Sequence, residues 1–171
     1  MQKKILFIMH LPPPVHGQSM VCQQIRQSEV INNTFNCRYV NLSASRAAEE
    51  VGSYGMMRTC KKLWRFAGSY LQTLWQLLTF RPEVCYLTIS CHGIPFLKDA
   101  PFVLLCKAFG SRIILHQHSK GMVTCAHKAP YKWLLPLIYR NTTVVLLSWR
   151  LYDDVSAVVT REQVKICPNG L

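Results

Sequence analysis

The sequence predicts an α/β fold with a mostly parallel sheet, and two observations support this. Short runs rich in β-branched residues alternate with longer segments of helical periodicity, which is typical of βαβ units. Half of the 171 residues are hydrophobic and 16% are charged, so the chain can bury a core and does not resemble a disordered tail. Since domains commonly hold about 100 to 200 residues, we expect a single doubly wound, Rossmann-like domain over residues 1–171.

Changes of period and turn residues set the bounds of the expected elements. The expected strands are Lys4–Met9, Asn36–Leu42, Val84–Ile89, Arg112–His116, Thr143–Leu147 and Val164–Cys167. The expected helices are Gln18–Val30, Met56–Thr79, Leu97–Phe109, Tyr131–Tyr139 and Leu151–Val158. Asn32-Asn33 would close the first helix, Pro82 would stop the second, and Gly110 would end the third in a left-handed conformation. Strands and helices should be joined by short connections.

The formal net charge is +12, and its main source is the middle of the chain. Between Glu50 and Asp153 the only acids are Glu83 and Asp99, while basic residues continue throughout. The charge therefore predicts an anionic partner: nucleic acid, an anionic membrane surface or a phosphate-bearing small molecule.

Four of these basic residues recur on one face of the second expected helix, at i, i+3, i+4 and i+7. They are Arg58, Lys61, Lys62 and Arg65. Such a face can lie on an anionic leaflet, and these four residues are the candidates for a membrane surface. The alternative is an ordinary solvated basic face above a stripe that points to the core.

The eight cysteines include no CxxC pair, and several lie in apolar runs, so we expect buried, reduced thiols and no zinc site. Five apolar residues after Lys3-Lys4 are too few for an export signal. No stretch reaches the roughly 18 consecutive apolar residues of a transmembrane helix. A cytoplasmic location follows, with peripheral attachment to the inner face of the cell membrane left open.

Ligands of open α/β sheets bind beyond the carboxyl ends of the strands, so the residues that follow each strand are the candidates for binding. After the first strand, Gly17, Gln18 and Ser19 would present N–H groups at a helix N-terminus, where phosphate can bind. His16 precedes them. The pattern is neither GxGxxG nor a P-loop, and a rigid turn that only caps the helix is the alternative.

Two further strand ends carry histidines. Residues 90–93 include Ser, Cys and His92, but no GxSxG elbow or orienting carboxylate, so we expect a cleft-lining loop rather than a nucleophile. His116 and His118 share one face of the fourth strand, followed by Lys120-Gly121. A metal site would need a further ligand, so a His that donates to a sugar or phosphate oxygen fits better, and we expect no metal or other cofactor.

Taken in order, these segments resemble the N-terminal half of a family 4 glycosyltransferase of the two-domain GT-B fold. The segments are residues 12–19, the strand 112–116 running into His118 and Gly121, residues 144–148, and residues 164–170. In that family the last pattern marks the end of the acceptor-binding domain, just before the hinge. The resemblance spans essentially the whole chain, and its strength lies in order and spacing.

The resemblance implies sugar transfer from a nucleotide-sugar donor to an acceptor hydroxyl, with retention and without a metal. Gly17 corresponds to the first-loop glycine that faces the donor phosphates and the acceptor, and His118 to the strand-end His that contacts the transferred sugar. Pro168-Asn169-Gly170 corresponds to the turn at the domain end. His16 stands where many members carry a second glycine. The expected catalytic residue is His118, and the expected substrate-binding residues are His16, Gly17, Gln18, Ser19, His92, Lys120 and Gly121.

The family's donor-binding half, with its paired Glu motif, has no counterpart in these 171 residues. We therefore expect weak or no transfer by the isolated chain, with a second Rossmann domain supplied elsewhere. The implied acceptor is a saccharide or a lipid-linked sugar of cell-surface polysaccharide or glycolipid synthesis. Two alternatives stay open: a non-enzymatic nucleic-acid binder, for which charge is the only support, and a Rossmann module of another small-molecule enzyme. Of these partners we do not expect nucleic acid.

Overall fold

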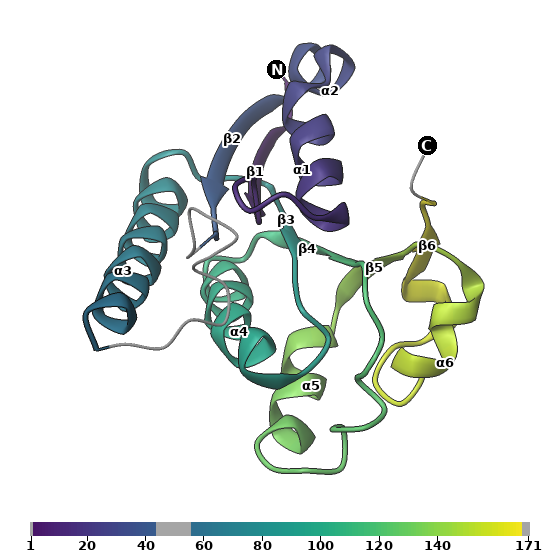
Figure 1. The fold of residues 1–171 in the computed structure, drawn as a ribbon. Coiled ribbons are helices and arrows are strands. Elements are labelled where there is room, and N and C mark those ends of the chain that lie inside the picture. The colour runs from purple at the N-terminus through teal and green to yellow at the C-terminus, as the bar shows by residue number, and fades with distance from the viewer. Residues whose placement is uncertain (1, 44–55, 169–171) are drawn as a thin grey trace. The chain divides into compact units, whose positions relative to one another are not determined.

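The computed structural model describes residues 2–43 and 56–168 (Figure 1). The chain is an α/β protein with a six-stranded, all-parallel sheet of strand order β2-β1-β3-β4-β5-β6. The predicted Rossmann-like fold class is therefore confirmed, with a sheet that is parallel throughout. The chain forms two compact units, Met1–Glu83 and Val84–Leu171.

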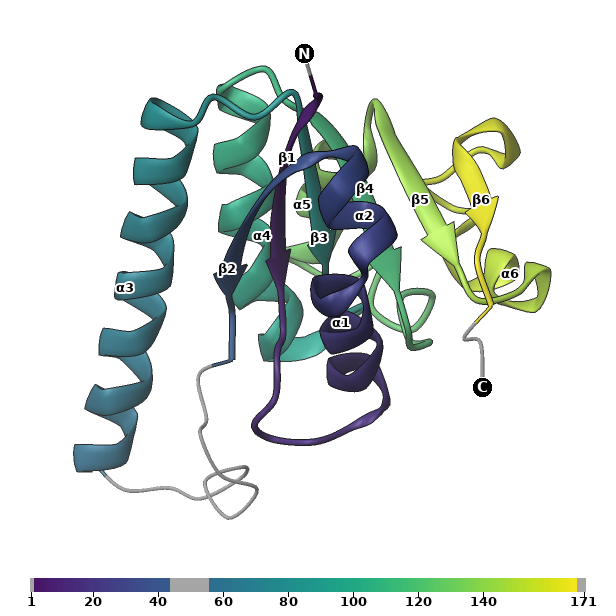
Figure 2. The same ribbon diagram turned by 90° about the horizontal axis from the view of Figure 1, so that it is seen from above.

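The N-terminal unit is built on two parallel strands, β1 (Lys4–Met9) and β2 (Asn36–Asn41). Figures 1 and 2 show α1 (Gly17–Gln27) and α3 (Met56–Thr79) on opposite sides of this pair. Four successive residues of β1 are buried: Leu6, Phe7, Ile8 and Met9. Burial of both faces is the usual state of a parallel strand and explains why β1 reads as a continuous apolar run.

The first expected helix is two helices in the structure, because Ser28 interrupts it. Ser28 leaves the helical conformation, and its side-chain oxygen accepts a hydrogen bond from the Ile31 N–H at 3.3 Å, which caps α2 (Glu29–Thr34). The prediction that Asn32-Asn33 closes the first helix is wrong, since both residues lie inside α2. The bounds of α3 are as predicted, and Arg81 turns with a φ of 50° before Pro82.

The C-terminal unit contains β3 (Val84–Thr88), β4 (Arg112–Gln117), β5 (Thr142–Leu146) and β6 (Val164–Ile166), with neighbours paired in parallel. All four strands lie within about one residue of their expected ends. Helices α4 (Gly93–Ala108) and α5 (Tyr131–Tyr139) pack side by side (Figure 1). Their buried side chains meet those of the strands in one core, which includes Leu87, Phe96, Phe102, Leu115, Leu135 and Val144.

Helix ends differ more from expectation in this unit. Helix α4 begins at Gly93 and tolerates Pro95 because the first turn needs no N–H at that position. In place of one helix over 151–158 there are a 3₁₀ turn, Trp149–Leu151, and the short helix α6, Tyr152–Val155. A second 3₁₀ turn, Arg161–Gln163, precedes β6. Gly110 has a φ of 75° after α4, as predicted.

Residues 118–130, which join β4 to α5, form a longer connection than the short ones expected. Short turns organise it, with Cys125 and Ala126 both donating N–H bonds to the Met122 carbonyl. Over the described residues, none of the helices combines the length and the apolar character that crossing a bilayer requires.

Candidate functional site

The candidate residues fall into two groups, one in each unit. The N-terminal unit holds residues 16–19 and the basic residues of α3. The C-terminal unit holds His92, His118 and Lys120-Gly121. Of the turn Pro168-Asn169-Gly170, the structure describes Pro168, which is exposed. Asn169 and Gly170 lie outside the described residues.

The first loop forms a reciprocal cap on α1. The Ser19 N–H donates to His16 Nδ1 at 3.2 Å, and the His16 N–H donates to Ser19 Oγ at 2.9 Å. Ser19 is fully buried, and its hydroxyl donates to the Pro14 carbonyl at 3.0 Å. The N–H of Ser19, expected to be free for a ligand, is therefore occupied. A Cβ on Gly17 would meet no atom within 4 Å, so this glycine faces open space.

A cavity of about 360 Å³ opens beside α3, where β1 and β2 end. Its lining is polar apart from one proline and one glycine: Pro13, Asn41, Ser43, Arg65, Gly68, Ser69 and Gln72. The volume lies within the range of small-molecule sites, about 300 to 1,000 Å³. Arg65 supplies its positive charge, so a residue expected at a membrane surface also lines a cavity.

Hydrogen bonds hold the frame of this cavity. The Asn41 side-chain oxygen accepts from the Leu11 N–H at 3.1 Å and the Ser43 N–H at 2.8 Å, which ties the two strand ends together. Ser69 donates its hydroxyl to the Asn41 carbonyl at 2.9 Å, which joins α3 to β2. Sequence reasoning missed Asn41 and Ser43, although the rule of inspecting residues that follow a strand applies to them as well.

In the C-terminal unit, His116 and His118 lie together at the end of β4, with ring centroids 4.0 Å apart. His116 is almost fully buried, and its Nδ1 is hydrogen-bonded to the Tyr86 hydroxyl. Burial, reinforced by the nearby His118, lowers the pKa of His116 from 6.5 to about 3. His116 is therefore neutral at physiological pH. The half-buried His118 is the member of the pair nearer to solvent.

Cys91 is bound into a buried network rather than poised for attack. Its thiol lies 2.7 Å from the Ser119 carbonyl and accepts from the Gln117 amide at 3.4 Å, and that amide also donates to the Tyr139 hydroxyl at 2.8 Å. Burial raises the pKa of the Cys91 thiol, with the negative charge of Asp154 adding to it. The thiolate form of Cys91 is therefore disfavoured.

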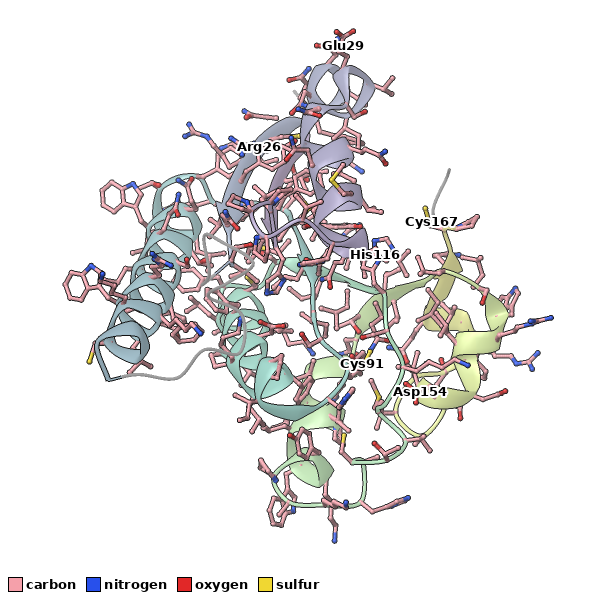
Figure 3. The ribbon with its side chains drawn as sticks, in the orientation of Figure 1. Arg26, Glu29, Cys91, His116, Asp154 and Cys167 are labelled. Carbon is pink, nitrogen blue, oxygen red and sulfur yellow. The ribbon has the colours of Figure 1, made fainter. Side chains whose placement is uncertain are left out.

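Asp154 organises the loop after β4, and sequence reasoning missed it. Its carboxylate accepts from the Gly121 N–H at 3.0 and 3.1 Å, from Met122 at 3.1 Å and from Val123 at 3.3 Å. Figure 3 shows Asp154 beside Cys91 in this unit. Three successive N–H groups of this kind form a nest that suits an anion, and here the chain's own carboxylate fills it. The N–H of Gly121 is therefore occupied.

The structure brings His92 and Gly121 together. A Cβ on Gly121 would stand 2.3 Å from His92 Nδ1, and Gly121 has a φ of 129°. Glycine is thus required here by a close approach and by the backbone. His92 and Lys120 are both exposed, and His92 occupies the N-cap position of α4 without a side-chain cap.

Among the described residues, no group of three or more His, Cys, Asp or Glu is placed to hold a metal ion. The arrangement offers two polar groups of residues: the lining of the cavity around Arg65, and His116 with His118 at the end of β4. The cavity, with its guanidinium and uncharged polar side chains, suits hydrogen bonds to an oxygen-rich, anionic small molecule. No family model matches the chain, and no curated protein matches it.

Proposed function

We propose that this chain is the acceptor-side part of a glycosyltransferase that uses a nucleotide sugar. The observation that carries the proposal is the cavity beside α3, where one guanidinium and four uncharged polar side chains gather at the ends of β1 and β2. Serine, asparagine and glutamine can bond sugar hydroxyls, and Arg65 suits a phosphate or another acidic group on the acceptor. The resemblance to family 4 glycosyltransferases supports the same assignment.

In this proposal His118 donates a hydrogen bond to an oxygen of the transferred sugar, and His16, Gly17, Gln18, His92 and Lys120 contribute substrate contacts. Catalysis rests on positioning and on stabilising the departing phosphate, without a general base or a metal. The role proposed for Ser19 and Gly121 is indirect: they shape the two loops whose other residues meet the substrate.

Titration of the purified chain tests the proposal. Calorimetry with nucleotide sugars, phosphorylated sugars and lipid-linked sugars should find a saccharide ligand, and Arg65→Ala should weaken the binding of a phosphorylated sugar by roughly ten- to a hundredfold. Lys61→Ala is the matched control, because it removes an equal charge from the same helix outside the cavity, and should change affinity less than about twofold. Equal losses in both variants, or no saccharide ligand, would contradict the proposal.

A further inference from the structure

The outward face of α3 is apolar, which is the reverse of an ordinary surface helix. Trp64, Leu71, Trp75 and Leu78 are all exposed, Trp64 at 81% and Trp75 at 63%. Their spacings of seven, four and three residues place them on one side of a helix that turns by about 100° per residue, over a length of about 21 Å. We call these four residues the α3 stripe.

The opposite side of α3 already has its core contacts. Thr73 and Leu77 are buried, and Ser69 is bonded to the end of β2. The α3 stripe therefore takes no part in the packing of the N-terminal unit. Two tryptophans and two leucines exposed in one row form a contiguous apolar patch, and such patches mark interaction surfaces.

The charges of α3 indicate what covers the stripe. The helix contains no acidic residue, and it carries Arg58, Lys61, Lys62 and Arg65. At about 100° per residue, Lys61 lies about 60° and Arg65 about 100° around the axis from Trp64, so cations flank the stripe along one side. The Lys61 side chain is exposed, and those of Lys62 and Arg65 are half-buried, while that of Arg58 lies outside the described residues.

We propose that the α3 stripe docks on the surface of an anionic lipid bilayer. Tryptophan prefers the boundary between headgroups and acyl chains, leucine enters the apolar side of it, and flanking cations are attracted to anionic headgroups. A second copy of the chain fits less well, because a symmetric contact through α3 would bring its cations together without any acidic residue of the helix to meet them.

Docking also places the cavity at the lipid surface. Four of its lining residues come from α3: Gly68, Gln72 and Arg65 lie about 40°, 80° and 100° around the axis from Trp64, next to the stripe, and Ser69 lies further round toward β2. A lipid-borne headgroup can thus reach the cavity while its tails stay in the bilayer. The docking itself stands apart from the proposed function, since vesicle binding and saccharide binding are measured separately.

Tryptophan fluorescence gives a sharp test, because the chain has four tryptophans and two of them form the stripe. The Trp133→Phe/Trp149→Phe chain keeps only Trp64 and Trp75, and the Trp64→Phe/Trp75→Phe chain keeps only the other pair. With vesicles that contain phosphatidylserine, emission of the first chain should shift to the blue and be quenched by brominated acyl chains. The second chain should show neither effect. A shift in the second chain alone, or in neither, overturns the proposal.

Co-sedimentation with vesicles measures how much the apolar residues and the basic residues of α3 each contribute to membrane binding. Trp64→Ser/Trp75→Ser should lower binding to phosphatidylserine vesicles by about tenfold or more, and Lys61→Gln should lower it by about fivefold. Trp133→Ser is the matched control, since Trp133 is 62% exposed and lies outside α3, and it should bind as the parent does. Equal binding to pure phosphatidylcholine vesicles would contradict the anionic preference. Self-association lost in the double variant, without vesicle binding, would assign the stripe to a second copy.

Discussion

Individual residues of this chain show how the same residue type takes different roles according to its surroundings. Ser19 is buried as a helix cap, whereas Ser43 and Ser69 line a cavity. His116 is neutral and enclosed by β-strands, whereas His92 is exposed at the start of α4. Burial and hydrogen-bond partners, rather than residue type, thus decide which positions are available to a ligand.

The low pKa of His116 predicts a pH dependence of stability. The folded-state pKa of about 3 lies below the usual 6.5, so the unfolded chain binds a proton first. The ionisation of His116 therefore costs no stability above about pH 6.5. Below that, the free energy of unfolding falls by at most about 1.4 kcal/mol per pH unit as the pH drops toward 3. Urea unfolding as a function of pH should show this slope, and His116→Gln should remove it. Titration of the His116 ring near pH 6.5 by NMR would refute the assignment.

Asp154→Asn should destabilise the protein by roughly 1–3 kcal/mol, because the amide turns a donor toward backbone N–H groups that need an acceptor. Asp153→Asn is the control, since that side chain is exposed one position earlier, and should stay within about 0.5 kcal/mol of the parent. Chemical denaturation compares the two. Equal stability of both variants would show that the carboxylate does not hold the loop.

Gly121→Ala should cost roughly 1–3 kcal/mol, because it combines a φ of 129° with a close approach to His92. The double variant His92→Ala/Gly121→Ala lacks the ring that the new Cβ would meet. It should regain the stability lost to that steric contact but not the stability lost to the strained backbone. Gly17→Ala, where a Cβ meets open space, should change stability by less than about 0.5 kcal/mol. Thermal unfolding of the four proteins measures these differences, and an unchanged Gly121→Ala variant would rule out the close approach.

At the scale of elements, α3 is the helix with two apolar sides, one for the core and one for solvent. Leu77 and Leu78 are adjacent in sequence, yet Leu77 is buried and Leu78 is about half exposed. Helix periodicity predicted the helix and its ends, but apolar residues on both sides left open which side would face the core.

Alanine at these two leucines should therefore have unequal effects. Leu77→Ala should lower the free energy of unfolding by roughly 2–5 kcal/mol, because it leaves a cavity in the packed face. Leu78→Ala should change it by less than about 0.5 kcal/mol. Urea denaturation of both variants provides the measurement, and a larger loss at Leu78 would mean that the outward side of α3 is packed after all.

At the scale of the whole molecule, the sequence combines a net charge of +12 with no recognisable nucleic-acid motif. We expect a short oligonucleotide to bind weakly, without sequence preference, and with an affinity that falls steeply as salt rises, since counterion release alone would drive it. Fluorescence anisotropy at several salt concentrations checks this. Tight, sequence-dependent binding that persists at high salt would favour the nucleic-acid alternative over the saccharide one.

Much of the architecture could be predicted from local patterns. The strands Lys4–Met9 and Val84–Thr88 and the helix Met56–Thr79 follow from period, β-branched residues and turn signals, all of which lie within a few neighbouring residues. Their alternation is enough to define the α/β class, because a βαβ unit has few ways to pack. The break at Ser28 was missed because a side-chain cap interrupted an otherwise continuous helical pattern.

The candidate sites depended on contacts between distant residues. Asp154 meets Gly121 across 33 positions, Ser69 meets Asn41 across 28, and Arg65 reaches a cavity that also involves Pro13. No periodicity records such pairs, because they arise only when the elements pack. Residue types and their order therefore defined the fold class and the list of candidate side chains. Tertiary packing alone decided which of them are occupied as structural caps, which line a cavity and which face outward on α3.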